Sequence, residues 1–157
     1  MPLTWPDLII EIDAASDSRA WLEPWRWLVT GRVGPRFLNR FGCWFLQRPD
    51  GSVHLLDVFY GDLEEVAPTF EAFQNLLNDP GWQRVYLLSD LVAELHATGV
   101  VASGTSCYAI APHPCIGGPD PWGSEPVPPS SIMVMDVLPW QGLCSQFVRF
   151  AHDVAPA

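Results

Sequence analysis

Acidic side chains crowd one short segment of this sequence. Asp57, Asp62, Glu64 and Glu65 fall within nine residues. Carboxylate oxygens at this density could bind a divalent cation, and a pair of carboxylates could act as acid and base in glycoside hydrolysis. The segment lacks the spacing of an EF-hand loop, and a single hairpin is a poor template for a hydrolase cleft. We therefore interpret it as a solvated acidic rim and expect no metal site here.

A second candidate for chemistry is the pair His113 and Cys115. A histidine two residues from a cysteine could form a nucleophile and its base, or part of a zinc site together with Cys107. No fourth ligand follows at a recognised spacing, and Pro114 separates the two side chains. No nucleophile elbow, P-loop or dinucleotide-binding fingerprint occurs either. We therefore expect no catalytic residues and no cofactor.

The segment that contains His113 is the first candidate for an interaction surface. Residues 111–130 hold seven prolines and three glycines, which excludes regular structure over most of this length. A loop this long in a compact domain is either functional or poorly ordered. The residues that we expect to contact a partner, from the acidic segment and from this loop, are Asp57, Asp62, Glu64, Glu65, His113, Asp120, Trp122 and Glu125.

The distribution of charge indicates the kind of partner. The net charge is −10. From Asp50 to Val148 the sequence has twelve Asp or Glu residues and a single Lys or Arg, which is Arg84. Such a field repels a phosphate backbone, so direct binding to nucleic acid is disfavoured, whereas a cationic protein would be attracted. Solubility is an equally good reason for an acidic surface.

The elements that must position these side chains centre on residues 41–67. Two runs with alternating apolar residues flank the turn Arg48 to Gly51, and a second turn at Tyr60 to Asp62 returns the chain, which predicts a three-stranded antiparallel meander. Both faces of the predicted strands are apolar. The sheet therefore needs cover on both sides.

Helical patterns supply that cover. The spacing predicts helices over about 16–29, 69–78 and 80–98, with Thr69 and Asp79 as caps of the last two and a possible division at Ser89–Asp90. Residues 106–110 are typical of a strand. Residues 131–150 are interpreted as a C-terminal hairpin, with strands at 132–138 and 143–150 joined across residues 139–142. The predicted fold class is α+β.

Size and composition favour one domain over residues 1–157, with 1–15 and 151–157 as peripheral segments. Hydrophobic residues make up 48% of the chain and charged residues 17%, so a packed core is expected. No apolar run reaches the roughly 20 residues of a membrane span. The N-terminal residues do not resemble a secretion signal, and the four cysteines have no disulfide-framework spacing, so a cytoplasmic protein with reduced thiols is expected.

A series of ordered landmarks completes the sequence analysis. They include Phe41-Gly42, Gly61 to Ala67, Pro112 to Gly118 and Gly142 to Gln146. In order and spacing, over roughly residues 20 to 150, they resemble a bacterial family of small domains of unknown function. Its members include the C-terminal part of immunity proteins paired with type VI secretion DNase toxins, and SUKH-like proteins are a distant comparison.

The resemblance implies a non-enzymatic immunity protein that binds a cationic, nuclease-type toxin in the cytoplasm. It transfers no catalytic residues to this chain. The alternative is a small-molecule-binding domain or hydrolase, whose pocket near residues 111–130 would be lined by aromatic residues, His113, Cys115 and Asp136. Such a pocket would be concave, with convergent polar groups.

Overall fold

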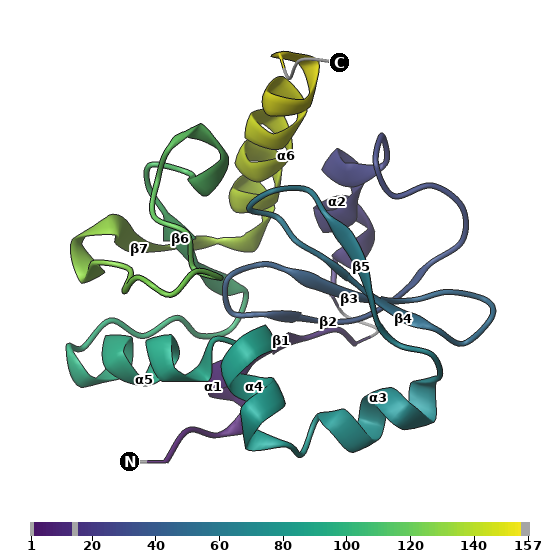
Figure 1. Ribbon diagram of the computed structural model, residues 1–157, viewed down its shortest axis with the longest axis horizontal. Helices are drawn as coiled ribbons and strands as arrows, with labels where there is room; N and C mark the ends of the chain where they lie inside the picture. Colours follow the sequence, from purple (N-terminus) through teal and green to yellow (C-terminus); the bar gives the residue numbers. More distant parts are fainter. Residues whose placement is uncertain (1, 14–15, 155–157) are drawn as a thin grey trace.

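The computed structural model describes residues 2–13 and 16–154, which form an α+β fold (Figure 1). Its main sheet is antiparallel, and its strands lie side by side in chain order: β1 (Ile9–Glu11), β2 (Gly34–Asn39), β3 (Trp44–Gln47), β4 (Val53–Leu56) and β5 (Leu63–Ala67). A separate antiparallel pair consists of β6 (Ser106–Ile110) and β7 (Ile132–Asp136). The helices are α1 (Trp5–Leu8), α2 (Ser18–Leu22), α3 (Phe70–Leu76), α4 (Pro80–Tyr86), α5 (Ser89–Ala97) and α6 (Val137–Val154).

The predicted meander is confirmed as β3, β4 and β5. In the first hairpin Trp44 pairs with Leu56 and Gln47 with Val53, so the turn at Gly51 sets the register. The second hairpin turns at Gly61, which has a φ of +79°. A Cβ at Gly61 would lie 2.3 Å from Cγ1 of Val148 on α6, so this turn both needs the left-handed backbone and packs closely on the last helix.

Both faces of the main sheet are covered, as predicted from their apolar composition. Neighbouring residues of β3 point to opposite faces. The Trp44 indole N–H donates to Gln141 on α6 at 2.9 Å, whereas the Phe45 ring packs against Phe73 of α3 and Trp82 of α4, with centroids 5.7 and 5.6 Å apart. Figure 1 accordingly shows α6 and α2 on one side of the sheet and α3, α4 and α5 on the other.

The prediction of a hairpin over 131–150 is wrong in its second strand. Residues 143–150 belong to α6, and β7 pairs instead with β6, in a register that joins Ser106 to Asp136 and Ile110 to Ile132. Pro139 suggested a turn, but it is the third residue of the helix, where the backbone N–H has no intrahelical acceptor and its loss costs little. The buried positions Trp140, Cys144 and Val148 repeat at helical spacing.

The predicted helix over 16–29 is also shorter than expected. Its regular part is α2, which continues as the 3₁₀ helix η1 (Glu23–Trp25) around Pro24. The caps of the next two helices are confirmed: Thr69 Oγ1 accepts from the Ala72 N–H at 3.1 Å, and Asp79 Oδ1 from the Gly81 N–H at 3.0 Å. The predicted segment 80–98 divides into α4 and α5 at Leu88, whose φ is +53°.

The ends of the chain differ in how they contribute. Residues 9–11 form the edge strand β1, and the side chains of Ile9 and Ile10 are buried, so part of the predicted peripheral segment 1–15 belongs to the core. Residues 151–154 continue α6, while 14, 15 and 155–157 lie outside the described residues. None of the helices in residues 2–13 and 16–154 has the length and apolar character needed to cross a bilayer.

A candidate acidic pocket

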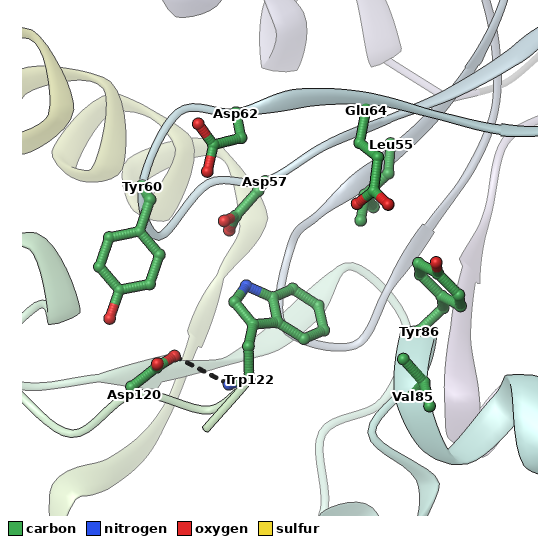
Figure 2. A pocket seen from close by; sticks show the side chains of 9 residues that line it. All are labelled: Leu55, Asp57, Tyr60, Asp62, Glu64, Val85, Tyr86, Asp120 and Trp122. Carbon is green, nitrogen blue, oxygen red and sulfur yellow. Dashed lines mark hydrogen bonds between the residues drawn. The ribbon is translucent and has the colours of Figure 1, made fainter. Parts of the chain in front are cut away.

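Three segments far apart in the sequence converge on one pocket of about 460 Å³ (Figure 2). They are the β4–β5 turn, the C-terminal end of α4 and the long loop between β6 and β7. We call this the acidic pocket. Its lining combines four carboxyl groups with three aromatic rings and two aliphatic side chains: Asp57, Asp62, Glu64, Asp120, Tyr60, Tyr86, Trp122, Leu55 and Val85.

The β4–β5 turn holds Asp57 in place through the backbone. The Asp57 N–H donates to the Asp62 carbonyl at 2.9 Å, and the Gly61 N–H donates to the Asp57 carbonyl at 2.8 Å. The Asp57 side chain accepts from the Phe59 N–H at 2.8 Å, the local pattern that makes aspartate common in turns. The carboxyl group is therefore oriented by the turn before any ligand arrives.

The register of β4 and β5 decides which glutamate enters the pocket. Glu64 lies opposite Leu55, and both line the pocket, whereas Glu65 lies opposite His54. Successive side chains of a strand point to opposite faces of the sheet. Glu65, an expected contact residue, is therefore exposed but outside the acidic pocket.

The long loop contributes Asp120 and Trp122. Asp120 Oδ1 accepts from the Trp122 N–H at 2.9 Å, the dashed line in Figure 2, and this bond forms a local turn in the middle of the loop. The Trp122 ring meets Phe59 edge to face, with centroids 5.8 Å apart. Its indole N–H points toward Asp57 and favours the ionised form of that carboxyl group. Trp122 thus joins the loop to the β4–β5 turn.

Helix α4 supplies the opposite wall. Tyr86 is the last residue of α4, where its carbonyl accepts from Asn39 Nδ2 at 3.0 Å and its ring lies 5.1 Å from that of Trp82. Glu64 acts on the Tyr86 phenol and Asp120 on the Tyr60 phenol, and in each case the carboxylate favours the protonated hydroxyl. Each tyrosine of the lining is therefore matched with one carboxylate.

Burial and like charge govern protonation in the acidic pocket. Asp57 is only 6% exposed, and its burial, with a smaller contribution from Asp62, raises its pKa to about 6, although the N–H groups of Phe59 and Trp122 favour its ionised form. Burial and the neighbouring Asp120 raise the pKa of Tyr60 to about 12. Burial, followed by Glu64, raises the pKa of Tyr86. The two phenols therefore stay protonated and remain donors at neutral pH.

Two other expected contact residues lie elsewhere. His113 is 2% exposed, so it cannot meet a partner, and it packs on the rings of Trp140 and Phe147 at 5.7 and 5.3 Å. Glu125 is exposed in a neighbouring shallow hollow beside Arg84. The loop thus divides into an anchored part near residue 113 and a part near residue 120 that faces the acidic pocket.

The structure brings His113 and Cys115 together, but in neutral form. His113 Nε2 donates to the Val58 carbonyl at 3.0 Å, so Nδ1 is the acceptor; it lies 3.0 Å from Cys115 Sγ and 3.3 Å from the Cys115 backbone N. Burial lowers the pKa of His113 to about 4 and raises that of Cys115. A thiolate nucleophile needs the reverse shifts. What the contact does in this fold is cap the 3₁₀ helix η2 (Pro114–Ile116), with His113 as the N-cap and Cys115 within the helix.

The remaining candidates for chemistry do not assemble. Asp136 pairs with Ser106 at the far end of the β6–β7 ladder from Ile110, and its side chain accepts from the Thr105 hydroxyl at 3.0 Å. It is therefore remote from His113. Within the part of the chain that the structure describes, no three His, Cys, Asp or Glu side chains are arranged to hold a metal ion.

Sequence reasoning identified five of the nine lining residues and missed four: Leu55, Tyr60, Val85 and Tyr86. Tyr60 lies in the predicted turn and could have been included on that ground. Tyr86 and Val85 belong to a helix whose contacts with the β4–β5 hairpin depend on the tertiary fold. No sequence pattern indicated them.

Comparison with known proteins adds no relative. No protein-family model matches this chain, and no curated protein matches it. The functional argument therefore depends on the geometry and charge of the acidic pocket.

Proposed function

We propose that this protein is a non-enzymatic binding module for a cationic protein, which it holds at the acidic pocket. The observation that carries the proposal is the convergence of Asp57, Asp62, Glu64 and Asp120 on one concavity. Among the described residues that line it, none is basic. Binding a cationic group would neutralise charge that the fold itself concentrates there.

Acidic residues outside the pocket would also attract a cationic partner. The excess of acidic residues after Asp50 gives most of the molecule a negative field, which speeds the encounter with a cationic partner at low ionic strength. Rim residues such as Glu65 and Glu125 are exposed and would contribute to this steering. The expected result is a fast association rate that falls steeply as salt is added.

The specific form of the proposal is an immunity protein that neutralises a nuclease-type toxin in the cytoplasm. A nuclease must present positive charge to phosphates, and an acidic protein can compete for that surface. The family resemblance of the landmarks between Phe41 and Gln146 supports the same function. The protein would then act by covering its partner and would need no chemistry of its own.

Co-expression tests this proposal. The protein is produced together with the product of a neighbouring gene that encodes a secreted nuclease, and both cell survival and a tagged pull-down are scored. We expect rescue from toxicity and recovery of a complex that dissociates in high salt. No rescue and no complex with any such product would overturn the immunity proposal.

A second candidate function is binding of a small molecule in the same pocket. Its volume falls within the range of ligand sites, and it lies beside the 111–130 loop. Native mass spectrometry of the freshly purified protein separates the two candidates. A retained small molecule, displaced when Glu64 is changed to Gln but not when Glu65 is, would favour this second function.

A further inference from the structure

The aromatic lining of the acidic pocket indicates which cationic group it accepts. Figure 2 shows the indole of Trp122 in the middle of the pocket, with the carboxylates of Asp57 and Glu64 on one side and Asp120 on the other. The lining places three aromatic side chains, Tyr60, Tyr86 and Trp122, among these carboxylates. A ligand in the pocket therefore meets aromatic ring faces as well as negative charge.

Carboxylates beside ring faces are complementary to a guanidinium group. It is planar, it stacks on aromatic rings, and its N–H groups donate in its own plane to carboxylate oxygens. An ammonium group is a compact, strongly hydrated charge that gains less from stacking. The pocket therefore combines the two kinds of contact that distinguish arginine from lysine.

The same chain already uses this combination within its own fold. The Arg36 guanidinium lies 4.4 Å from the centroid of the Phe70 ring, while its Nε donates to the Gln47 side-chain oxygen at 2.7 Å. There a ring face and an in-plane acceptor hold one arginine. The acidic pocket repeats that arrangement with charged acceptors and without an arginine of its own among the described lining residues.

We infer that the acidic pocket is a receptor for one arginine side chain of the partner, stacked on Trp122 and paired with Glu64 and Asp120. This inference rests on the proposed function, because it names the group by which the cationic protein is held. Asp57 contributes a carboxyl group that is nine-tenths buried, oriented by the turn and without a basic neighbour in the pocket lining.

The test uses small probes and the full chain. N-acetyl-arginine methylamide is titrated into the protein and followed by the NMR signals of the tryptophan indole N–H groups, with the Trp122 signal assigned from Trp122→Phe. The lysine and citrulline methylamides serve as matched probes. Lysine keeps the positive charge but lacks a planar group, and citrulline has a planar urea group without the charge. We expect arginine to move the Trp122 signal, with lysine binding about fivefold more weakly and citrulline not binding.

Two variants of one strand provide the control. Glu64→Gln and Glu65→Gln remove the same charge from adjacent exposed positions, but only Glu64 lines the pocket. We expect Glu64→Gln to weaken arginine binding about fivefold and Glu65→Gln to change it less than twofold. Equal effects of the two variants, equal binding of lysine and arginine, or no response to arginine would each overturn the inference.

The probe titration and the partner pull-down, both made with the two glutamate variants, separate this inference from the proposed function. If a cationic partner is captured but Glu64→Gln and Glu65→Gln weaken it equally, the arginine receptor is wrong and the binding module stands. If the arginine probe binds as expected but no cationic protein is captured, the proposed function is wrong, and a free guanidinium compound becomes the ligand.

Discussion

Two buried polar side chains, Gln141 and Asp57, have very different surroundings in this fold. Gln141 on α6 has no exposed surface; its oxygen accepts from the indoles of Trp25 and Trp44 at 2.7 and 2.9 Å, and its nitrogen donates to the Gly42 carbonyl at 2.8 Å. Asp57 is nearly as buried, yet the pocket that it lines holds three further carboxylates and, among the lining residues, no basic side chain.

The comparison separates a structural polar group from one in the candidate site. The hydrogen-bonding capacity of Gln141 is met within the protein, so it fixes the packing of α6 on the sheet. The charge of Asp57 is favoured by the N–H groups of Phe59, Trp122 and Tyr60 but meets no basic residue of the pocket lining, and burial raises its pKa to about 6. Burial of the Asp57 charge destabilises the fold, whereas burial of Gln141 does not. A destabilising buried charge in a pocket favours a role for that pocket besides stability.

The largest effect is expected on the structural side. Gln141→Leu should lower the free energy of unfolding by about 4 kcal/mol, because it leaves two indole N–H groups and a carbonyl buried without partners. Urea denaturation followed by circular dichroism measures this. Gln146→Leu, at an exposed position of the same helix, is the control and should cost less than about 1 kcal/mol. Similar losses of stability in both variants would show that Gln141 is no more important for the fold than an exposed residue of the same helix.

Asp57→Asn is expected to raise the free energy of unfolding at neutral pH. The folded-state pKa of Asp57 is raised from 3.8 to about 6, so the folded protein binds this proton more tightly than the unfolded chain. Wild-type stability therefore falls as pH rises between about 4 and 6, by about 3 kcal/mol from this group. Asparagine keeps the acceptor for the Phe59 N–H and removes the charge.

Unfolding curves at a series of pH values test this sign. Asp57→Asn should be the more stable protein at pH 7, and the difference should close as pH falls below about 4, where Asp57 is protonated in both states. Taking the difference between variant and wild type removes the titration of all other groups. A difference that does not depend on pH would show that Asp57 carries no burial cost.

A glycine pair tests whether the pocket turn depends on α6. Gly61 and Gly51 both have positive φ, but only Gly61 has an atom within 3 Å of the position of an added Cβ. Both alanine variants pay the backbone cost of about 1 kcal/mol, and Gly61→Ala should lose about 2 kcal/mol more because Val148 must move. Thermal unfolding ranks the two variants. Equal losses of stability would mean that the close packing of Gly61 against Val148 does not constrain the turn.

The smallest effect on stability is expected in the acidic pocket itself. Glu64 is exposed and interacts with Tyr86 only at the surface of the pocket, so Glu64→Gln should change the free energy of unfolding by less than about 0.5 kcal/mol. Chemical denaturation beside the Glu65→Gln protein checks this. A loss above about 2 kcal/mol would place Glu64 with Gln141 as a structural residue.

Local patterns in the sequence were sufficient for much of the fold. Alternation around the turn near Gly51 predicted the meander, Thr69 and Asp79 marked two helix starts, and apolar residues on both strand faces predicted cover on both sides. These features depend on neighbours within a few residues. The last helix escaped prediction because Pro139 and Gly142, which suggest a turn, both fit within α6.

The candidate site was predictable only in part. Asp57, Asp62 and Glu64 come from one turn and were found by their spacing, and Asp120 and Trp122 by the composition of their loop. His113 was wrong as a contact residue because its ring fills a gap between η2 and α6. Nothing local distinguishes a histidine that packs inside from one that faces solvent.

The sequence by itself determined the class of fold, the acidic character and the turn that orients Asp57, because periodicity, charge and turn chemistry are properties of short segments. Only the tertiary structure decided that the end of α4 and the middle of the loop, at Asp120 and Trp122, come together at that turn (Figure 2). Their meeting depends on how helices pack over both faces of the sheet, which is a balance of contacts between residues distant in the chain. For that reason the aromatic walls became visible only in three dimensions.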